Sequence, residues 1–154
     1  MYSMVGAFTY FCYHWTMNDV IPSVGVIVFQ GSNVLLVQKR NHPRQAYQLP
    51  GGQIEQGESV KEAALRELLE TTGLKGDPTQ VTVLPDEWSA RIEKTYGVKI
   101  FSFKCVICKV YTGGIHENES AVPVWVEQSK LGELNLVPNT LMAIEAAERT
   151  LGAT

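Results

Sequence analysis

Two glutamates in the stretch RELLETTG, Glu67 and Glu70, lie three positions apart and directly follow Arg66. On a helix these residues are surface neighbours, so their carboxylates could share one divalent cation or hold two. Hard cations such as Mg²⁺ take oxygen ligands and usually bind through one or two carboxylates together with substrate phosphates. A lone E-x-x-E is more typical of a solvated helix face, so its surroundings must decide between the two interpretations.

A helix over residues 59–72 is predicted to carry this pair. Ser59 is a favourable N-cap, and Glu62 three residues later completes a capping box. The body VKEAALRELLETT is rich in helix formers, and Gly73 is the expected glycine after the last turn. The predicted buried stripe is Val60, Ala64, Leu65, Leu68 and Leu69, with Ala63, Glu67, Glu70 and Thr71 on a different face.

A glycine-rich loop, LPGG, feeds into this helix from its N-terminal side. Gly51 and Gly52 would let the backbone approach a metal ion or a phosphate closely, because they carry no side chain. Arg66 could pair with Glu58 or Glu62 on adjacent turns and stiffen the site.

The whole segment from Gly52 to Leu74 resembles the Nudix box, G-x5-E-x7-R-E-U-x-E-E-x-G-U, in which U is a bulky aliphatic residue. The matching positions are Gly52, Glu58, Arg66, Glu67, Leu68, Glu70, Gly73 and Leu74. The resemblance extends from about Val20 to the C-terminus through VGVIVF, VLLVQKR and VPVWVEQSKLGEL. The departure is Thr71, where the family pattern has a glutamate that is often a principal metal ligand.

The resemblance implies an α/β (α+β) fold, a Nudix-type α/β/α sandwich around a mixed β-sheet. It also implies Mg²⁺- or Mn²⁺-dependent cleavage of the diphosphate linkage in a nucleoside diphosphate joined to another moiety. The Nudix domain is expected to span residues 20–154, and residues 1–19 are expected to form an aromatic extension.

Roles for individual residues follow from the same resemblance. The implied catalytic residues are Glu67, Glu70, Arg66 and Glu119, and the implied metal site comprises Glu67, Glu70, Gly51 and Glu119. The implied substrate-binding residues are Arg40, Arg44, Gly52 and Tyr47, and the structural supports are Glu58 and Gly73. Glu119 supplies the loop carboxylate that many members add beyond the box, with Glu117 as second choice and a solvated loop as the alternative.

Thr71 leaves three interpretations open, because a neutral hydroxyl is a poor ligand for a hard cation. The site could bind metal more weakly, or its base or metal number could differ from those of relatives. Alternatively, the domain could have lost hydrolysis and become a nucleotide-binding or sensing module. An isomerase of diphosphate esters on the same fold is a further alternative.

The substrate is less constrained, since the residues that select it lie outside the box. Tyr47, Trp88 and Tyr96 could stack on a base, although packing is the more ordinary role for each. Family frequency favours ADP-ribose or nucleotide sugars, then oxidised nucleoside triphosphates. The formal charge of −3 argues against nucleic acid as a partner, and RNA decapping ranks lower for that reason.

Length and composition fit one globular domain of 154 residues. With three cysteines and no secretory pattern, a reducing, cytoplasmic location is expected. Cys105 and Cys108 fall in a predicted strand, where residues three apart point to opposite faces, so neither redox nor zinc chemistry is favoured.

The aromatic segment MYSMVGAFTYFCYHW is too short and too polar to cross a membrane. It is interpreted as an added strand or arm. The alternative is that Met17 is the natural start of the protein. A homodimer is expected from the family resemblance, and this arm could contribute to it.

Further elements follow from hydrophobic periodicity. Strands are predicted at residues 24–29, 34–40, 80–84, 98–111 and 122–126, with a hairpin turn at 30–33 and a loop at 41–57. A C-terminal helix at residues 139–151 should direct Leu141, Ile144, Ala147 and Leu151 inward.

Overall fold

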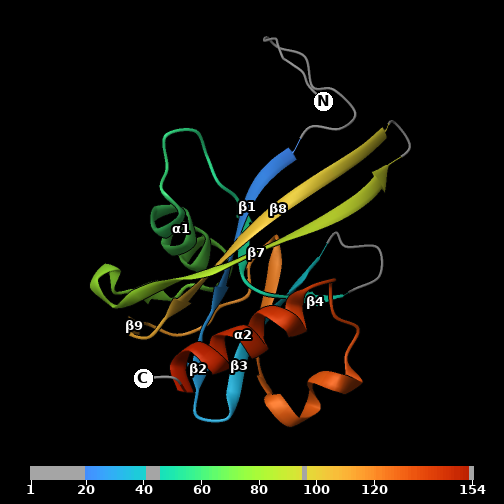
Figure 1. Ribbon diagram of the computed structural model, residues 1–154. Helices are drawn as coiled ribbons and strands as arrows, with labels where there is room; N and C mark the ends of the chain where they lie inside the picture. The colour runs from blue at the N-terminus through green and yellow to red at the C-terminus, as the bar shows by residue number, and fades with distance from the viewer. Residues whose placement is uncertain (1–19, 41–45, 95–96, 153–154) are drawn as a thin grey trace.

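The computed structural model describes residues 20–40, 46–94 and 97–152 (Figure 1). The aromatic extension of residues 1–19 and the candidates Arg44 and Tyr96 lie outside these ranges, so the predictions about them stay predictions. The helices and strands are β1 (Val20–Ile27), β2 (Phe29–Gln30), β3 (Asn33–Lys39), β4 (Tyr47–Gln48), β5 (Gly51–Gln53), α1 (Val60–Thr72), β6 (Lys75–Gly76), η1 (Pro78–Gln80), β7 (Val81–Lys94), β8 (Gly97–Cys108), β9 (Tyr111–Thr112), β10 (Ala121–Glu127), η2 (Gln128–Glu133) and α2 (Thr140–Gly152).

The longer strands form two sheets, one mixed and one antiparallel. One has the order β5-β1-β8-β7, in which β1 and β8 are parallel and the other pairs are antiparallel. The second has the order β10-β3-β2, with β4 pairing on β3, and all of its pairs are antiparallel. The chain passes directly from β1 into β2, which joins the two sheets.

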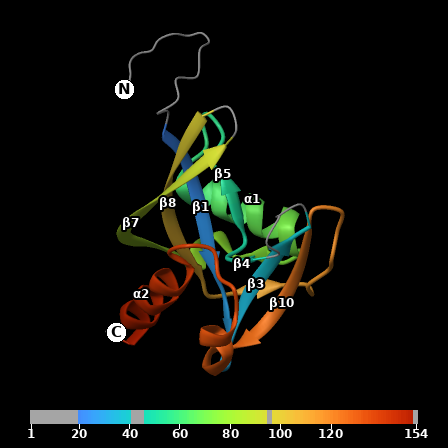
Figure 2. The same ribbon diagram turned by 90° about the vertical axis from the view of Figure 1, so that its right-hand side faces the viewer.

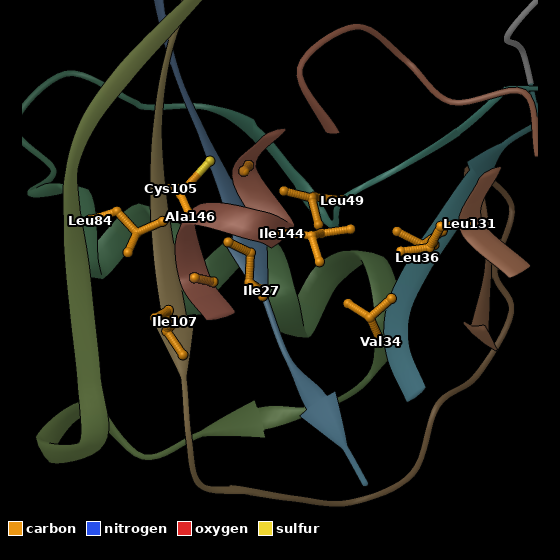
Figure 3. Close-up of a cluster of buried hydrophobic side chains, with 12 residues drawn as sticks. Ile27, Val34, Leu36, Leu49, Leu84, Cys105, Ile107, Leu131, Ile144 and Ala146 are labelled. Carbon is orange, nitrogen blue, oxygen red and sulfur yellow. The ribbon is translucent and has the colours of Figure 1, made fainter. Parts of the chain in front are cut away.

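Two hydrophobic clusters lie on opposite faces of these strands, because successive strand side chains alternate between faces. Val26 of β1 packs in the cluster under α1, whereas its neighbour Ile27 packs in the cluster under α2. Figure 2 shows the two helices on either side of the strands, and Figure 3 shows the α2-side cluster. This arrangement confirms the predicted α/β/α sandwich.

The predicted helices form, but each buried face is rotated from the one expected. Leu69 is 50% exposed and Leu141 is 40% exposed, so both were wrongly predicted to face the core. On α1 the buried residues are instead Ala63, Ala64, Leu68, Thr71 and Thr72. The helix lies against the glycine strand β5 as well as β1. This packing buries Ala63 and Thr71, which were predicted to lie on a different face from the buried stripe, while Glu70 on the same face stays exposed.

Several strand boundaries also differ from the predictions. β7 runs to Lys94 rather than ending at residue 84, and residues 98–111 divide into β8 and part of β9. The stretch predicted as a loop at 41–57 contains the short strands β4 and β5. Cys105 and Cys108 are buried on opposite faces of β8, as predicted, and both are free thiols.

The β7 and β8 strands continue as a two-stranded ribbon past the end of β1 (Figure 1). β1 pairs with β8 only from Ile100 onward, whereas β7 and β8 stay paired as far as Lys94 and Gly97. No helix within the described residues is long and apolar enough to span a membrane.

Candidate active site

Helix α1 begins and ends where the sequence predicts. The Ser59 side chain accepts a hydrogen bond from the Glu62 backbone, and the Glu62 carboxylate accepts one from the Ser59 backbone. Gly73 closes the helix in the left-handed conformation at φ 91°, which favours glycine. These two ends fix the register of the helix, and so the direction of its carboxylates.

Arg66 is the centre of a charged network on α1. Its Nε lies 2.6 Å from Glu58 Oε2 and its Nη2 lies 3.0 Å from Glu58 Oε1, a two-pronged contact suited to the planar guanidinium. Its Nη1 donates to Glu67 Oε2 at 3.0 Å and to Glu70 Oε1 at 3.2 Å, and its Nη2 donates to the Gln53 carbonyl at 3.0 Å. The Arg66 guanidinium therefore connects the carboxylates of Glu67 and Glu70 to the loop that precedes the helix.

This network shifts two pKa values in opposite directions. The hydrogen bond from Arg66 is the main cause that lowers the pKa of Glu58 below its ordinary value of 4.5. The hydrogen bond to Glu58, opposed by partial burial and helped by Glu67, raises the pKa of Arg66. Arg66 thus stays cationic and Glu58 stays anionic at neutral pH.

The lowered pKa of Glu58 predicts a specific loss of stability in acid. A group whose pKa is lowered by folding stabilises the protein above its unfolded pKa and loses this effect as pH falls through the folded pKa. The difference in urea unfolding midpoint between wild type and Glu58→Gln should therefore be constant above about pH 4.5 and shrink below it. A difference that stays the same between pH 7 and pH 3 would contradict the assignment.

Glu67 is held against the glycine strand. Its side chain is only 13% exposed, and a Cβ atom added at Gly52 would lie 2.5 to 2.7 Å from the three atoms of its carboxylate. Gly52 pairs with Val24 of β1, so it cannot easily move away. The Glu67 carboxylate can therefore occupy this position only because Gly52 has no side chain.

Glu70 differs, since its side chain is 59% exposed and faces solvent beyond Arg66. Among residues 20–40, 46–94 and 97–152, no three His, Cys, Asp or Glu side chains converge on a point that would hold a metal ion. The donor set thus fits a cation such as Mg²⁺ that takes two carboxylates from the protein and its other ligands from phosphate and water.

Thr71, the departure from the box, is 5% exposed and faces the interior. Its hydroxyl donates to the Glu67 carbonyl at 2.7 Å, one turn back along the helix. The hydroxyl proton is therefore used within the helix, and no carboxylate stands at this position.

Replacing Thr71 by glutamate should add a carboxylate one turn from Glu67. We expect Thr71→Glu to lower the Mg²⁺ concentration at half-maximal turnover about 10-fold, because a further anionic oxygen strengthens binding of a hard cation. A metal titration of turnover for both proteins measures this, with melting temperature as the control for burial of the new charge. An unchanged midpoint in a stably folded variant would show that another ligand already occupies that position.

The remaining predicted residues occupy three places around this helix. Arg40 lies at the end of β3 with its side chain 43% exposed, and its Nη2 is 3.5 Å from Glu117. Glu119 is exposed on the loop before β10. Tyr47 of β4 is half-buried, pairs with Gln38 of β3 and packs against the α2-side core, and Gly51 pairs with Gly25 of β1.

A cavity of about 270 Å³ lies on the other face of β5. It is lined by Gly51 and Gly52, by the aromatic side chains Trp88, Phe101 and Phe103, and by residues of α2. The rings of Phe101 and Phe103 lie 6.2 Å apart in a stacked arrangement. Stacking on planar groups is the ordinary chemistry of such a wall, so the cavity suits a nucleobase or another flat ring.

Sequence reasoning identified Trp88 as an aromatic candidate but missed Phe101 and Phe103. Their signal is the alternation in the segment FSFKC, which places Phe101, Phe103 and Cys105 on one face of a strand. This signal becomes informative only when the face is known to border a cavity.

Comparison with known proteins places this geometry in a family. The NUDIX domain model matches residues 20–140, which is most of the chain. The chain belongs to the Nudix family. The match includes the whole glycine loop, helix α1 and the loop before β10.

Among curated proteins, an RNA pyrophosphohydrolase of Roseobacter denitrificans is 38% identical over 68 residues, covering 44% of this chain and 42% of that protein. An ADP-ribose pyrophosphatase of Methanocaldococcus jannaschii is 43% identical over 56 residues, covering 34% of this chain and 33% of that protein. The matched segment thus spans about two fifths or less of the length of these relatives.

Two solved structures show the shared Nudix fold. The MutT NUDIX hydrolase from Burkholderia pseudomallei superposes with a TM-score of 0.69 at 20% identity, covering 83% of this chain and 98% of that one. The NUDIX domain of Shewanella oneidensis NrtR, solved with ADP ribose, superposes with a TM-score of 0.68 at 22% identity, covering 86% and 89%.

Proposed function

We propose that this Nudix protein is a divalent-metal-dependent pyrophosphohydrolase that cleaves the diphosphate linkage of a nucleoside diphosphate joined to another moiety. The observation that carries the proposal is the placement of β5. Gly52 leaves room for the Glu67 carboxylate on one face of this strand, and an aromatic cavity lies on the other face. A nucleotide whose base lies in the cavity would extend past Gly51 and Gly52. Its diphosphate would then lie next to the carboxylates of Glu67 and Glu70.

Glu67 and Glu70 would hold the metal ion, with the Gly51 backbone beside them. When bound, a divalent ion neutralises phosphate charge and lowers the pKa of attacking water. Arg66 fixes the Glu67 and Glu70 carboxylates in place before substrate arrives, through the 3.0 and 3.2 Å contacts of its Nη1. Such preorganised charge costs no reorganisation during the reaction.

The balanced reaction adds one water molecule across the linkage. The water oxygen bonds to one phosphorus, the bond from that phosphorus to the bridging oxygen breaks, and the bridging oxygen leaves with the other phosphate. A carboxylate accepts the water proton, a role we assign to Glu119 on the basis of family resemblance. Arg40 at the end of β3 would face the phosphate charge, and Glu58 would keep Arg66 in place.

ADP-ribose or a nucleotide sugar is the proposed substrate class, with oxidised nucleoside triphosphates second. The names of the relatives support a diphosphate linkage in the substrate, since one acts on ADP-ribose and the other on RNA. Mg²⁺ as the natural ion, a homodimer and a cytoplasmic location complete the proposal.

A substrate panel tests it. Purified protein with Mg²⁺ or Mn²⁺ should release nucleoside monophosphate from at least one of ADP-ribose, nucleotide sugars and oxidised nucleoside triphosphates. The panel also contains short 5′-triphosphorylated RNA, for which release of pyrophosphate is measured. Release only from the RNA would retain the reaction and overturn the proposed substrate class. No turnover across the panel, with binding of ADP-ribose retained, would favour the sensing module that Thr71 leaves open.

A further inference from the structure

The C-terminal end of α1 is closed by the loop of residues 113–120. The last four carbonyls of a helix have no partners within it. Here the Leu69 carbonyl accepts from Gly73 N, and the Thr72 carbonyl accepts from His116 N at 2.8 Å. The two carbonyls between them, of Glu70 and Thr71, both accept from Asn118 Nδ2, at 3.3 and 3.2 Å.

The Asn118 amide also organises its own loop. Its Oδ1 accepts hydrogen bonds from the backbone of Ser120 at 2.8 Å and of Ala121 at 3.0 Å. The side chain thus donates to the helix and accepts from the loop. Among residues of similar size only an amide can do both, since a carboxylate has no proton to donate at neutral pH.

The same residue holds Arg40 through its backbone. Arg40 Nε donates to the Asn118 carbonyl at 2.8 Å, and Arg40 N donates to the Ser120 carbonyl at 2.9 Å. The Nη2 of Arg40 meets Glu117 at 3.5 Å. Because the side chain of Asn118 is fixed to α1 and its carbonyl fixes Arg40, one residue connects the guanidinium to the helix that carries Glu67 and Glu70.

We propose that Asn118 is a positioning residue for diphosphate binding that acts through Arg40. It sets the orientation of the Arg40 guanidinium relative to the α1 carboxylates, so that the substrate phosphates meet a cation that is already in place. This inference rests on the proposed function, because it gives Arg40 a phosphate ligand.

A double-mutant cycle on the full-length protein tests the inference, with α,β-methylene-ADP as a binding probe in the presence of Mg²⁺. We expect Arg40→Ala to weaken binding about 10-fold, as for loss of a charged hydrogen bond. Asn118→Ala should weaken it roughly 5-fold. The double variant should bind no more weakly than Arg40→Ala.

Two further variants separate positioning from general loss of stability. Asn118→Asp still accepts from Ser120 and Ala121 but cannot donate to the helix, so it should weaken binding as Asn118→Ala does. Asp77→Ala removes another loop-capping side chain, whose carboxylate accepts hydrogen bonds from Thr79 N and Thr79 Oγ1. It should lower the melting temperature without changing probe affinity.

The outcomes are distinct. The inference is overturned if the effects of Asn118→Ala and Arg40→Ala on probe affinity multiply in the double variant. It is also overturned if Asn118→Asp binds the probe with wild-type affinity. In either case, turnover by the wild-type protein would still uphold the proposed function. A wild-type protein that neither binds the probe nor turns over any panel compound would overturn both.

Discussion

Glu67→Gln is expected to reduce metal-dependent turnover at least about 100-fold while leaving the protein folded. The amide has the same shape, so it still fits beside Gly52, but it lacks the charge that a hard cation requires. Loss of even an outer partner of a metal site typically costs 10- to 100-fold, and Glu67 is assigned as a direct ligand. The measurement is kcat/KM over a range of Mg²⁺ concentrations, together with the melting temperature.

A matched control is Glu145→Gln, which neutralises an exposed glutamate on α2, away from the carboxylate network. It should leave turnover unchanged. If Glu67→Gln retains full activity at every Mg²⁺ concentration, Glu67 is not a metal ligand.

Arg66→Met should have the second largest effect, because it removes the only partner that joins Glu58, Glu67 and Glu70 among the described contacts. We expect turnover to fall between about 10- and 100-fold, and the melting temperature to fall by about 5 °C. Three carboxylates would then repel one another with no cation between them. Steady-state kinetics and thermal unfolding with and without Mg²⁺ measure the two effects.

Arg66→Lys distinguishes geometry from charge. Lysine keeps the positive charge but lacks the planar fork that contacts both oxygens of Glu58, so it should not restore the melting temperature. Arg149→Met on α2 serves as the control for loss of an exposed arginine. Wild-type stability and turnover in Arg66→Met would contradict the role of the network.

Local rules predicted the parts of the site that depend on neighbouring residues. The capping box of Ser59 and Glu62, the terminal Gly73 and the Arg66–Glu58 pair all involve residues within about two helical turns. For the same reason the family resemblance, which is concentrated in one continuous segment, led to the correct sandwich fold.

Features set by long-range packing could not be predicted in this way. Leu69 matches the apolar stripe of an isolated helix, yet it is exposed because α1 packs against β5, where the Glu67 carboxylate lies over Gly52. β7 continues to Lys94 because β8 pairs with it, although its residues beyond Leu84 are not strongly apolar. In the first place packing against β5, and in the second pairing with the strand that follows in the chain, overrides the local pattern.

The loop before β10 shows the same limit within the site. The segment HENES has the composition of a polar loop, and its glutamates are the expected metal ligands because carboxylates bind hard cations. Asn118 carries no charge, and its contacts with Glu70, Thr71 and Arg40 span between 47 and 78 positions of the sequence. No local pattern could indicate them.

The most direct test of metal-dependent diphosphate hydrolysis is product analysis in ¹⁸O-labelled water. Wild-type protein is incubated with the best substrate of the panel and Mg²⁺, and a parallel reaction contains EDTA. We predict one ¹⁸O atom on a phosphate group of a single product, and intact substrate in the EDTA reaction. Equal turnover in EDTA, or ¹⁸O on carbon rather than phosphate, would contradict the proposed chemistry.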